Sequence, residues 1–155
     1  MRARADEAGL RVALVVSRYH DFVTRRLRDG AMAALEEAGV SGPAVEIFEV
    51  AGAYELPQAA RAAADTRRFD AVICLGCVIR GETPHFEYIA SAAALGVMQA
   101  ALQTRVPITF GVLTTNSAEE ALARAGAGPA NKGREAAAAA LDLARLFRRL
   151  GGRDE

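Results

Sequence analysis

Ala71-Val-Ile-Cys-Leu-Gly76 is the stretch of sequence that decides the fold. Its apolar and partly β-branched side chains do not alternate with polar ones, which is typical of a strand buried on both faces. Three further apolar runs of strand length lie at Arg11–Val16, Ala44–Val50 and Pro107–Leu113. Strands of this kind belong to parallel sheets, because helices cover both faces of such sheets.

Helical patterns separate these runs, and most begin at a residue type that caps helices. The predicted helices run from Asp21 to about Gly39, Glu55 to about Arg67, Thr83-Pro84 to about Gln103, Ala118 to about Arg124 and Asn131 to about Leu150. The capping residues would be Asp21, Thr83, Ser117 and Asn131.

Strands that alternate with helices predict a single three-layer α/β/α domain. Its sheet would be four-stranded and mostly parallel, with a flavodoxin-like topology. We expect this domain to span residues 11–150. An N-terminal arm, 1–10, would precede it, and a flexible tail, 151–155, would follow.

The charge balance limits the class of partner. The 155 residues include 19 basic and 19 acidic ones, so the formal net charge is zero. This argues against a nucleic acid or an anionic membrane as the main partner. Hydrophobic residues make up 52% of the chain, which excludes long disordered segments. The first nine residues lack the apolar segment of a secretory signal, and we expect a cytoplasmic protein.

The longest uncharged run, Tyr88–Thr104, has 17 residues and is rich in alanine. This length is borderline for a membrane span, and the run contains the polar residues Ser91, Gln99 and Gln103. We therefore expect a buried helix or one that contacts another subunit.

The two cysteines form the sequence Cys74-Leu-Gly-Cys77. A CxxC pair can be a redox motif or half of a zinc site. Zinc would need further ligands, and the only histidines, His20 and His85, are far apart in the sequence. Residues i and i+3 of a strand point to opposite faces, so these thiols should not pair. We expect two buried or ligand-facing thiols and no metal site.

Gly81-Glu-Thr-Pro-His85 is the most informative of the segments that follow the strands. Parallel α/β proteins bind ligands at that edge of the sheet. A glycine before a helix start presents free N–H groups and the positive end of the helix dipole, which suits a phosphate. The nucleotide signatures GxxxxGK[ST] and GxGxxG are absent, so a small phosphorylated substrate fits better. His85 would be the second residue of the helix, neutral and able to exchange protons; the alternative is an incidental surface histidine.

Four more residues have two interpretations each. Arg124 ends a short helix, where a cation is a normal structural feature. Lys132, the only lysine, follows the Asn131 cap, where the dipole disfavours a cation, so a ligand oxygen or solvent must compensate. Phe110 lies in an apolar strand and is by default a core residue. Tyr19 could stack on a flat ring or simply cover the end of the sheet.

Together these segments resemble the lumazine synthase family from about Arg11 to Phe147. The Val78-Ile-Arg-Gly-x-Thr-x-His85 segment is the most specific of the shared motifs. Tyr19, His20, Ala51 and Cys77 replace residues that are commoner in the family. In chain order the motifs are Arg18-Tyr-His-Asp21, Ala51-Gly-Ala-Tyr-Glu-Leu-Pro57, Gly76-Cys-Val-Ile-Arg-Gly-Glu-Thr-Pro-His-Phe86, Phe110-Gly-Val-Leu-Thr114, Arg124-Ala-Gly126 and Asn131-Lys-Gly133.

The resemblance implies a transferase-class enzyme of riboflavin biosynthesis. It would condense 5-amino-6-(D-ribitylamino)uracil with L-3,4-dihydroxy-2-butanone 4-phosphate to 6,7-dimethyl-8-ribityllumazine, releasing phosphate and water. No cofactor or metal is implied. The implied assembly is a homo-oligomer of pentamer rings, and the short connection from Arg124 to Asn131 favours an icosahedral assembly of pentamers. Riboflavin synthase is implied as a candidate partner.

The same resemblance implies a role for each matching residue. His85 would be the proton-transfer residue. Phosphate binding would fall to Glu82, Thr83 and Arg124. Phe110, Arg124 and Lys132 would enter each site from a neighbouring subunit. Pyrimidine and ribityl binding would involve Tyr19, Ala53, Tyr54, Glu55, Cys77, Val78, Ile79, Phe110 and Lys132.

Three other functions remain open on sequence grounds. Lys132 could be the nucleophile of a Schiff-base enzyme, although it lies at a helix start and not in an apolar strand pocket. A flavodoxin-like receiver module would need clustered acids after the first strand, and the sequence lacks them. A riboflavin-binding or shell-forming paralogue would keep the fold without the activity.

Overall fold

The computed structural model describes residues 9–81 and 84–151. Its sheet contains β1 (Val12–Ser17), β2 (Val45–Val50), β3 (Ala71–Ile79) and β4 (Ile108–Thr115). The strand order is β2-β1-β3-β4, and every pairing between neighbours is parallel. This is the flavodoxin-like order, so the predicted three-layer architecture is confirmed.

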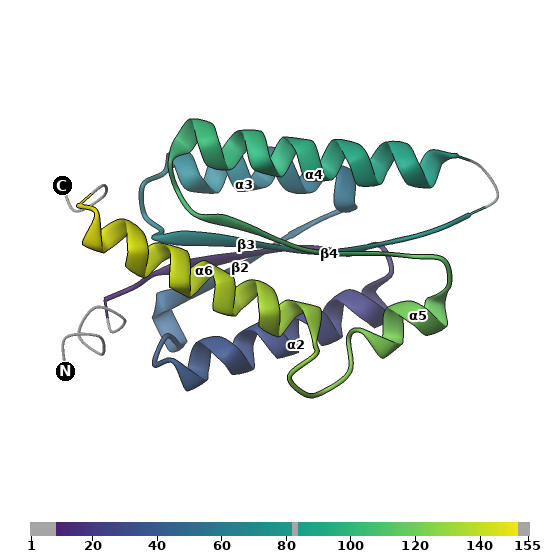
Figure 1. Ribbon diagram of the computed structural model, residues 1–155, viewed down its shortest axis with the longest axis horizontal. Helices are drawn as coiled ribbons and strands as arrows, with labels where there is room; N and C mark the ends of the chain where they lie inside the picture. Colours follow the sequence, from purple (N-terminus) through teal and green to yellow (C-terminus); the bar gives the residue numbers. More distant parts are fainter. Residues whose placement is uncertain (1–8, 82–83, 152–155) are drawn as a thin grey trace.

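Helices cover both faces of this sheet (Figure 1). On one face lie α2 (Asp21–Glu37), α5 (Ala118–Ala123) and α6 (Lys132–Arg149); on the other lie α3 (Leu56–Asp65) and α4 (His85–Thr104). Each helical layer packs on its own apolar cluster, one around Leu14, Leu27 and Leu141 and the other around Val15, Leu56 and Val97. Alternate residues of the strands supply both clusters, which explains their continuous apolar runs.

Two strands, β3 and β4, are longer than the sequence predicts. Cys77, Val78 and Ile79 continue β3 beyond its predicted end at Gly76 because they pair with Leu113, Thr114 and Thr115 of β4. A side chain at position 76 would crowd the helix that covers this strand, since a Cβ there would lie 2.9 Å from the Leu56 side chain. Cys77 to Ile79 are therefore strand residues, and not part of a loop.

The helix starts agree with the predictions in part. Ser117 and Asn131 cap α5 and α6 through their side chains, as predicted. Asp21 is not a cap: His20, in the left-handed conformation, precedes α2, and Asp21 is its first residue. Pro84 occupies the cap position of α4, so His85 is its first and not its second residue. The predicted cap Thr83 lies outside the described residues.

The helix α4 corresponds to the uncharged run of the sequence. Tyr88, Leu95, Met98 and Leu102 lie at helical spacing on it, and their side chains are exposed to solvent. No helix within residues 9–81 and 84–151 combines the length and apolarity that a bilayer span requires. Exposed apolar residues in such a stripe mark an interaction surface.

Candidate functional site

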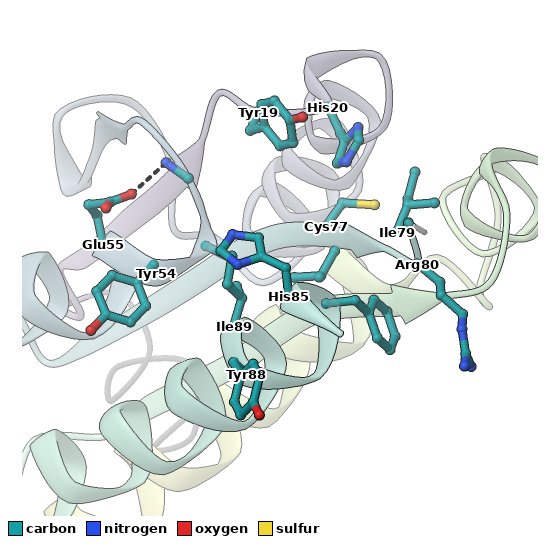
Figure 2. Close-up of a pocket in the computed structure, with 15 residues that line it drawn as sticks. Tyr19, His20, Tyr54, Glu55, Cys77, Ile79, Arg80, His85, Tyr88 and Ile89 are labelled. Atoms are coloured by element: carbon teal, nitrogen blue, oxygen red, sulfur yellow. Dashed lines mark hydrogen bonds between the residues drawn. The ribbon is translucent and has the colours of Figure 1, made fainter. Parts of the chain in front are cut away.

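The main pocket opens at the carboxyl ends of the strands and has a volume of about 730 Å³ (Figure 2). Four separate chain segments line it: the turn before α2, the 3-10 turn before α3, the end of β3 and the first turns of α4. The lining residues are Tyr19, His20, Gly52, Ala53, Tyr54, Glu55, Cys77, Val78, Ile79, Arg80, Gly81, His85, Phe86, Tyr88 and Ile89.

Backbone hydrogen bonds place the first two segments against each other. The parallel pairing of β1 and β2 continues past the strands, where the Tyr19 N–H donates to the Ala51 carbonyl at 2.9 Å. The Gly52 N–H then donates to Oε1 of Glu55, also at 2.9 Å, which closes the 3-10 turn Ala53–Glu55. Tyr19 and Tyr54 are thereby held at the rim, with 68% and 63% of their surfaces exposed.

The floor of the pocket is apolar and buried. Ala53, Cys77 and Val78 are all less than 10% exposed although they line the cavity. Burial raises the pKa of the Cys77 thiol to about 11, so this thiol is neutral at physiological pH. A neutral, weakly polar floor beneath exposed aromatic rings suits the flat face of a heterocycle.

Both histidines of the chain line this pocket, although 64 residues separate His20 from His85. His85 is exposed in the first turn of α4, and Figure 2 shows its imidazole among the pocket side chains. The His20 ring lies 4.4 Å from the Tyr19 ring and 6.0 Å from the Phe22 ring. Burial lowers the pKa of His20, so its ring stays uncharged down to pH values somewhat below the usual pKa of histidine.

Sequence reasoning assigned no role to His20, Phe86, Tyr88 or Ile89. The sequence offered only weak signals for a role in binding. His20 is next to Tyr19, and the other three residues follow His85 at positions that also fit a buried helix face. Arg80 also lines the pocket, but its guanidinium points away from the other labelled side chains (Figure 2).

Three predicted residues do not reach the pocket of the same chain. Phe110 is half-buried in β4 and packs on the apolar cluster beneath α3 and α4. Arg124 follows α5, and Lys132 begins α6, in the helical layer opposite α4. The Lys132 ammonium lies 3.9 Å from Oε1 of Glu135, which is not the apolar setting of a Schiff-base nucleophile. Glu82 and Thr83 lie outside the described residues.

The thiols occupy separate environments. Cys74 belongs to the cluster beneath α3 and α4, and Cys77 to the cluster beneath α2 and α6. Both are free, as strand geometry predicts. Within the described ranges, no group of three or more histidine, cysteine or carboxylate side chains is placed to hold a metal ion.

The fold and the pocket define a flavodoxin-like α/β protein whose pocket, at the carboxyl edge of the sheet, is lined by aromatic rings and by a histidine at a helix start. Comparison with known proteins gives the particular family. The family model described as 6,7-dimethyl-8-ribityllumazine synthase matches residues 9–148, and the chain belongs to this family.

Similar proteins carry the same family name. The chain is 47% identical to 6,7-dimethyl-8-ribityllumazine synthase of Syntrophus aciditrophicus, with 92% of each protein covered. It is 50% identical to the protein of that name from Salinibacter ruber, over 93% of this chain and 92% of the relative. It is 46% identical to the 6,7-dimethyl-8-ribityllumazine synthase of Chlorobium chlorochromatii, with 92% of each protein covered.

Proposed function

We propose that this protein condenses 5-amino-6-(D-ribitylamino)uracil with L-3,4-dihydroxy-2-butanone 4-phosphate to form 6,7-dimethyl-8-ribityllumazine. The observation that carries the proposal is the family match along nearly the whole chain. The pocket supports it, because it gathers Tyr19, the Ala53–Glu55 turn, Cys77–Ile79 and His85 from distant segments. These are the positions to which the family resemblance assigns the ring, the ribityl chain and the proton transfer.

Binding accounts for much of the expected rate. The aromatic amine and the ketone react intrinsically to form an imine, so holding them in contact removes most of the entropic barrier. Tyr19 would stack on the pyrimidine over the apolar floor. The ribityl hydroxyls would meet the polar turn at Glu55, whose second carboxylate oxygen has no hydrogen bond among those of the described residues. The cavity volume is within the usual range for small-molecule sites.

Proton transfer falls to His85. Imine formation expels water, elimination then expels phosphate, and ring closure onto the second nitrogen expels a further water. Each stage moves protons between nitrogen, carbon and oxygen, and one imidazole at the pocket can donate and accept them in turn. The start of α4 would stabilise the phosphate as it leaves, through the helix dipole.

The remaining positive charge that stabilises the phosphate would come from another subunit. Arg124 and Lys132 lie across the sheet from His85, so a second copy must supply them if they act in this pocket. The exposed stripe of α4 supports an oligomer, since Tyr88 belongs both to this stripe and to the pocket lining. A heterologous contact of this kind closes into rings, in line with a pentamer and an icosahedral assembly of pentamers. Riboflavin synthase as a partner and the cytoplasm as the location belong to the same proposal.

The direct test is product formation by the purified protein. We expect lumazine fluorescence to appear when both substrates are supplied. His85→Ala should lower turnover about tenfold to a few hundredfold, the usual scale of general acid–base help. Glu87→Ala is the matched control, because Glu87 lies in the same exposed turn of α4 but does not line the pocket. Normal turnover in a folded His85→Ala variant would contradict the assignment of His85.

Sharing of the site between subunits has its own test. A His85→Ala variant and an Arg124→Ala variant, both strongly impaired at butanone phosphate concentrations below the wild-type KM, are mixed under conditions that let the rings reassemble. In a random one-to-one mixture roughly a quarter of interfaces join two intact halves, so activity should rise toward that fraction of wild type. Mixed rings without recovered activity would place the whole site within one chain.

A further inference from the structure

Asn131 is a buried polar residue at the junction of three segments. Only 4% of its surface is exposed. Its Nδ2 amide donates to the carbonyls of Ala125 and Gly126, both at 3.0 Å, and to that of Arg26 in α2 at 3.2 Å. Its Oδ1 accepts the Arg134 N–H at 3.0 Å and so caps α6. One side chain therefore joins α2, the turn after α5 and the start of α6.

These contacts use both donor hydrogens of the amide. The Nδ2 group carries two hydrogens and faces three carbonyls, so one hydrogen is shared. A helix cap needs only an acceptor oxygen, which serine supplies as well as asparagine. The donating half of the Asn131 side chain is thus in excess of what α6 requires.

Two glycines keep the space that this side chain occupies. A Cβ at Gly30 would overlap the Asn131 amide, with its Nδ2 at 2.9 Å and its other atoms nearer. A Cβ at Gly133 would lie 3.0 Å from Oδ1 of Asn131. The amide is therefore packed in one orientation between α2 and α6.

The donor contacts are made directly beside Arg124. Ala125 and Gly126, which accept from Nδ2, are the next two residues of the chain. The Arg124 carbonyl accepts the Lys132 N–H at 3.0 Å, which ties the turn to the start of α6 a second time. The Arg124 side chain itself is exposed and extends from this tethered backbone.

We propose that Asn131 is a positioning residue, which through its amide donors holds the turn after α5 so that Arg124 is presented to the substrate phosphate. The inference rests on the proposed function, in which Arg124 binds that phosphate. Asn131 would touch no substrate. Its effect would fall mainly on the phosphorylated substrate, because Oδ1, which caps α6 beside Lys132, is not one of the donors.

Asn131→Ser separates the two halves of the side chain. Serine keeps a capping oxygen, loses the amide donors and introduces no charge. We expect the KM for the butanone phosphate to rise about tenfold, as for a weakened charge-assisted contact. The KM for the pyrimidine should stay within about twofold of wild type. Glu37→Gln is the matched control, since it removes the charge and one of the two acceptors of the Arg134–Glu37 contact between α2 and α6 and leaves the turn intact.

Two further variants distinguish positioning from mere stability. In the Arg124→Ala background, Asn131→Ser should cause no further rise in the KM for the butanone phosphate, because it acts through Arg124. Asn131→Thr keeps a capping hydroxyl and fills more of the vacated space than serine does, so it should recover stability yet leave that KM raised. If Asn131→Ser alone folds poorly, the threonine variant carries the test.

Three outcomes overturn the inference: additive effects with Arg124→Ala, equal loss for both substrates, or recovery of the KM when Asn131→Thr restores stability. Failure of the proposed function is seen separately. In that case the wild type forms no lumazine at all, or Arg124→Ala leaves the KM for the butanone phosphate unchanged.

Discussion

Gly133→Ala is expected to destabilise the protein, although alanine is the better helix former. Gly133 lies in the first turn of α6, where α6 crosses α2. A Cβ there would lie 2.7 Å from the Leu27 carbonyl carbon and nearer still to its oxygen. Carbon atoms normally approach to about 3.5 Å, so the two helix backbones would have to separate by roughly 0.8 Å or more.

The expected magnitude is the difference of two terms. Overpacking against a backbone that cannot rotate away costs about 3 kcal/mol, the upper part of the usual range. Alanine in place of glycine returns about 1 kcal/mol of helix propensity. The net loss is about 2 kcal/mol, which in a domain of this size lowers Tm by about 4–8 °C.

Thermal and denaturant unfolding at one fixed protomer concentration measure this loss, since dissociation makes Tm depend on concentration. Gly126→Ala is the matched control, because a Cβ there would meet only the Ala123 carbonyl, at 3.9 Å. It should be neutral or stabilise by up to about 1 kcal/mol. A Gly133→Ala protein as stable as the wild type would refute the close approach of α2 and α6.

The remaining predictions concern the pocket. Arg124→Ala should raise the KM for the butanone phosphate about tenfold to a hundredfold and spare pyrimidine binding. Tyr19→Ala should do the opposite and weaken pyrimidine binding. Titration of each substrate separately checks both predictions, and a variant that weakens both substrates equally would contradict its prediction. Burial raises the pKa of Cys77 to about 11 and that of Cys74 to about 12, against a usual 9.0. Iodoacetamide at pH 8 should therefore label the native thiols about a hundredfold more slowly than the unfolded chain, and rapid labelling of the native protein would show that the β3 floor is open.

Much of the fold was predictable because its signals are local. The apolar run at Ala71–Gly76 and its three counterparts predicted a sheet covered on both faces, and Ser117 and Asn131 predicted helix starts from their own side chains. The end of β3 was predicted wrongly, since the pairing of Ile79 with Thr115 depends on a strand more than thirty residues away. Asp21 was wrongly taken as a cap because nothing local signals the left-handed His20.

The residues of the candidate site also divide into those that the sequence indicated and those that only the tertiary structure placed. The sequence by itself indicated Tyr19 and His85, since polar and aromatic residues after strands lie at the ligand-binding edge of a parallel sheet, and the family resemblance added Glu55. Only the tertiary structure brought His20 into the same pocket as His85 and placed Arg124 in the layer opposite His85. Periodicity and capping are properties of neighbouring residues, and the chain carries them in any fold. Which side chains share a cavity depends on strand order and on how closely helices approach, and both are set by contacts between residues distant in the sequence.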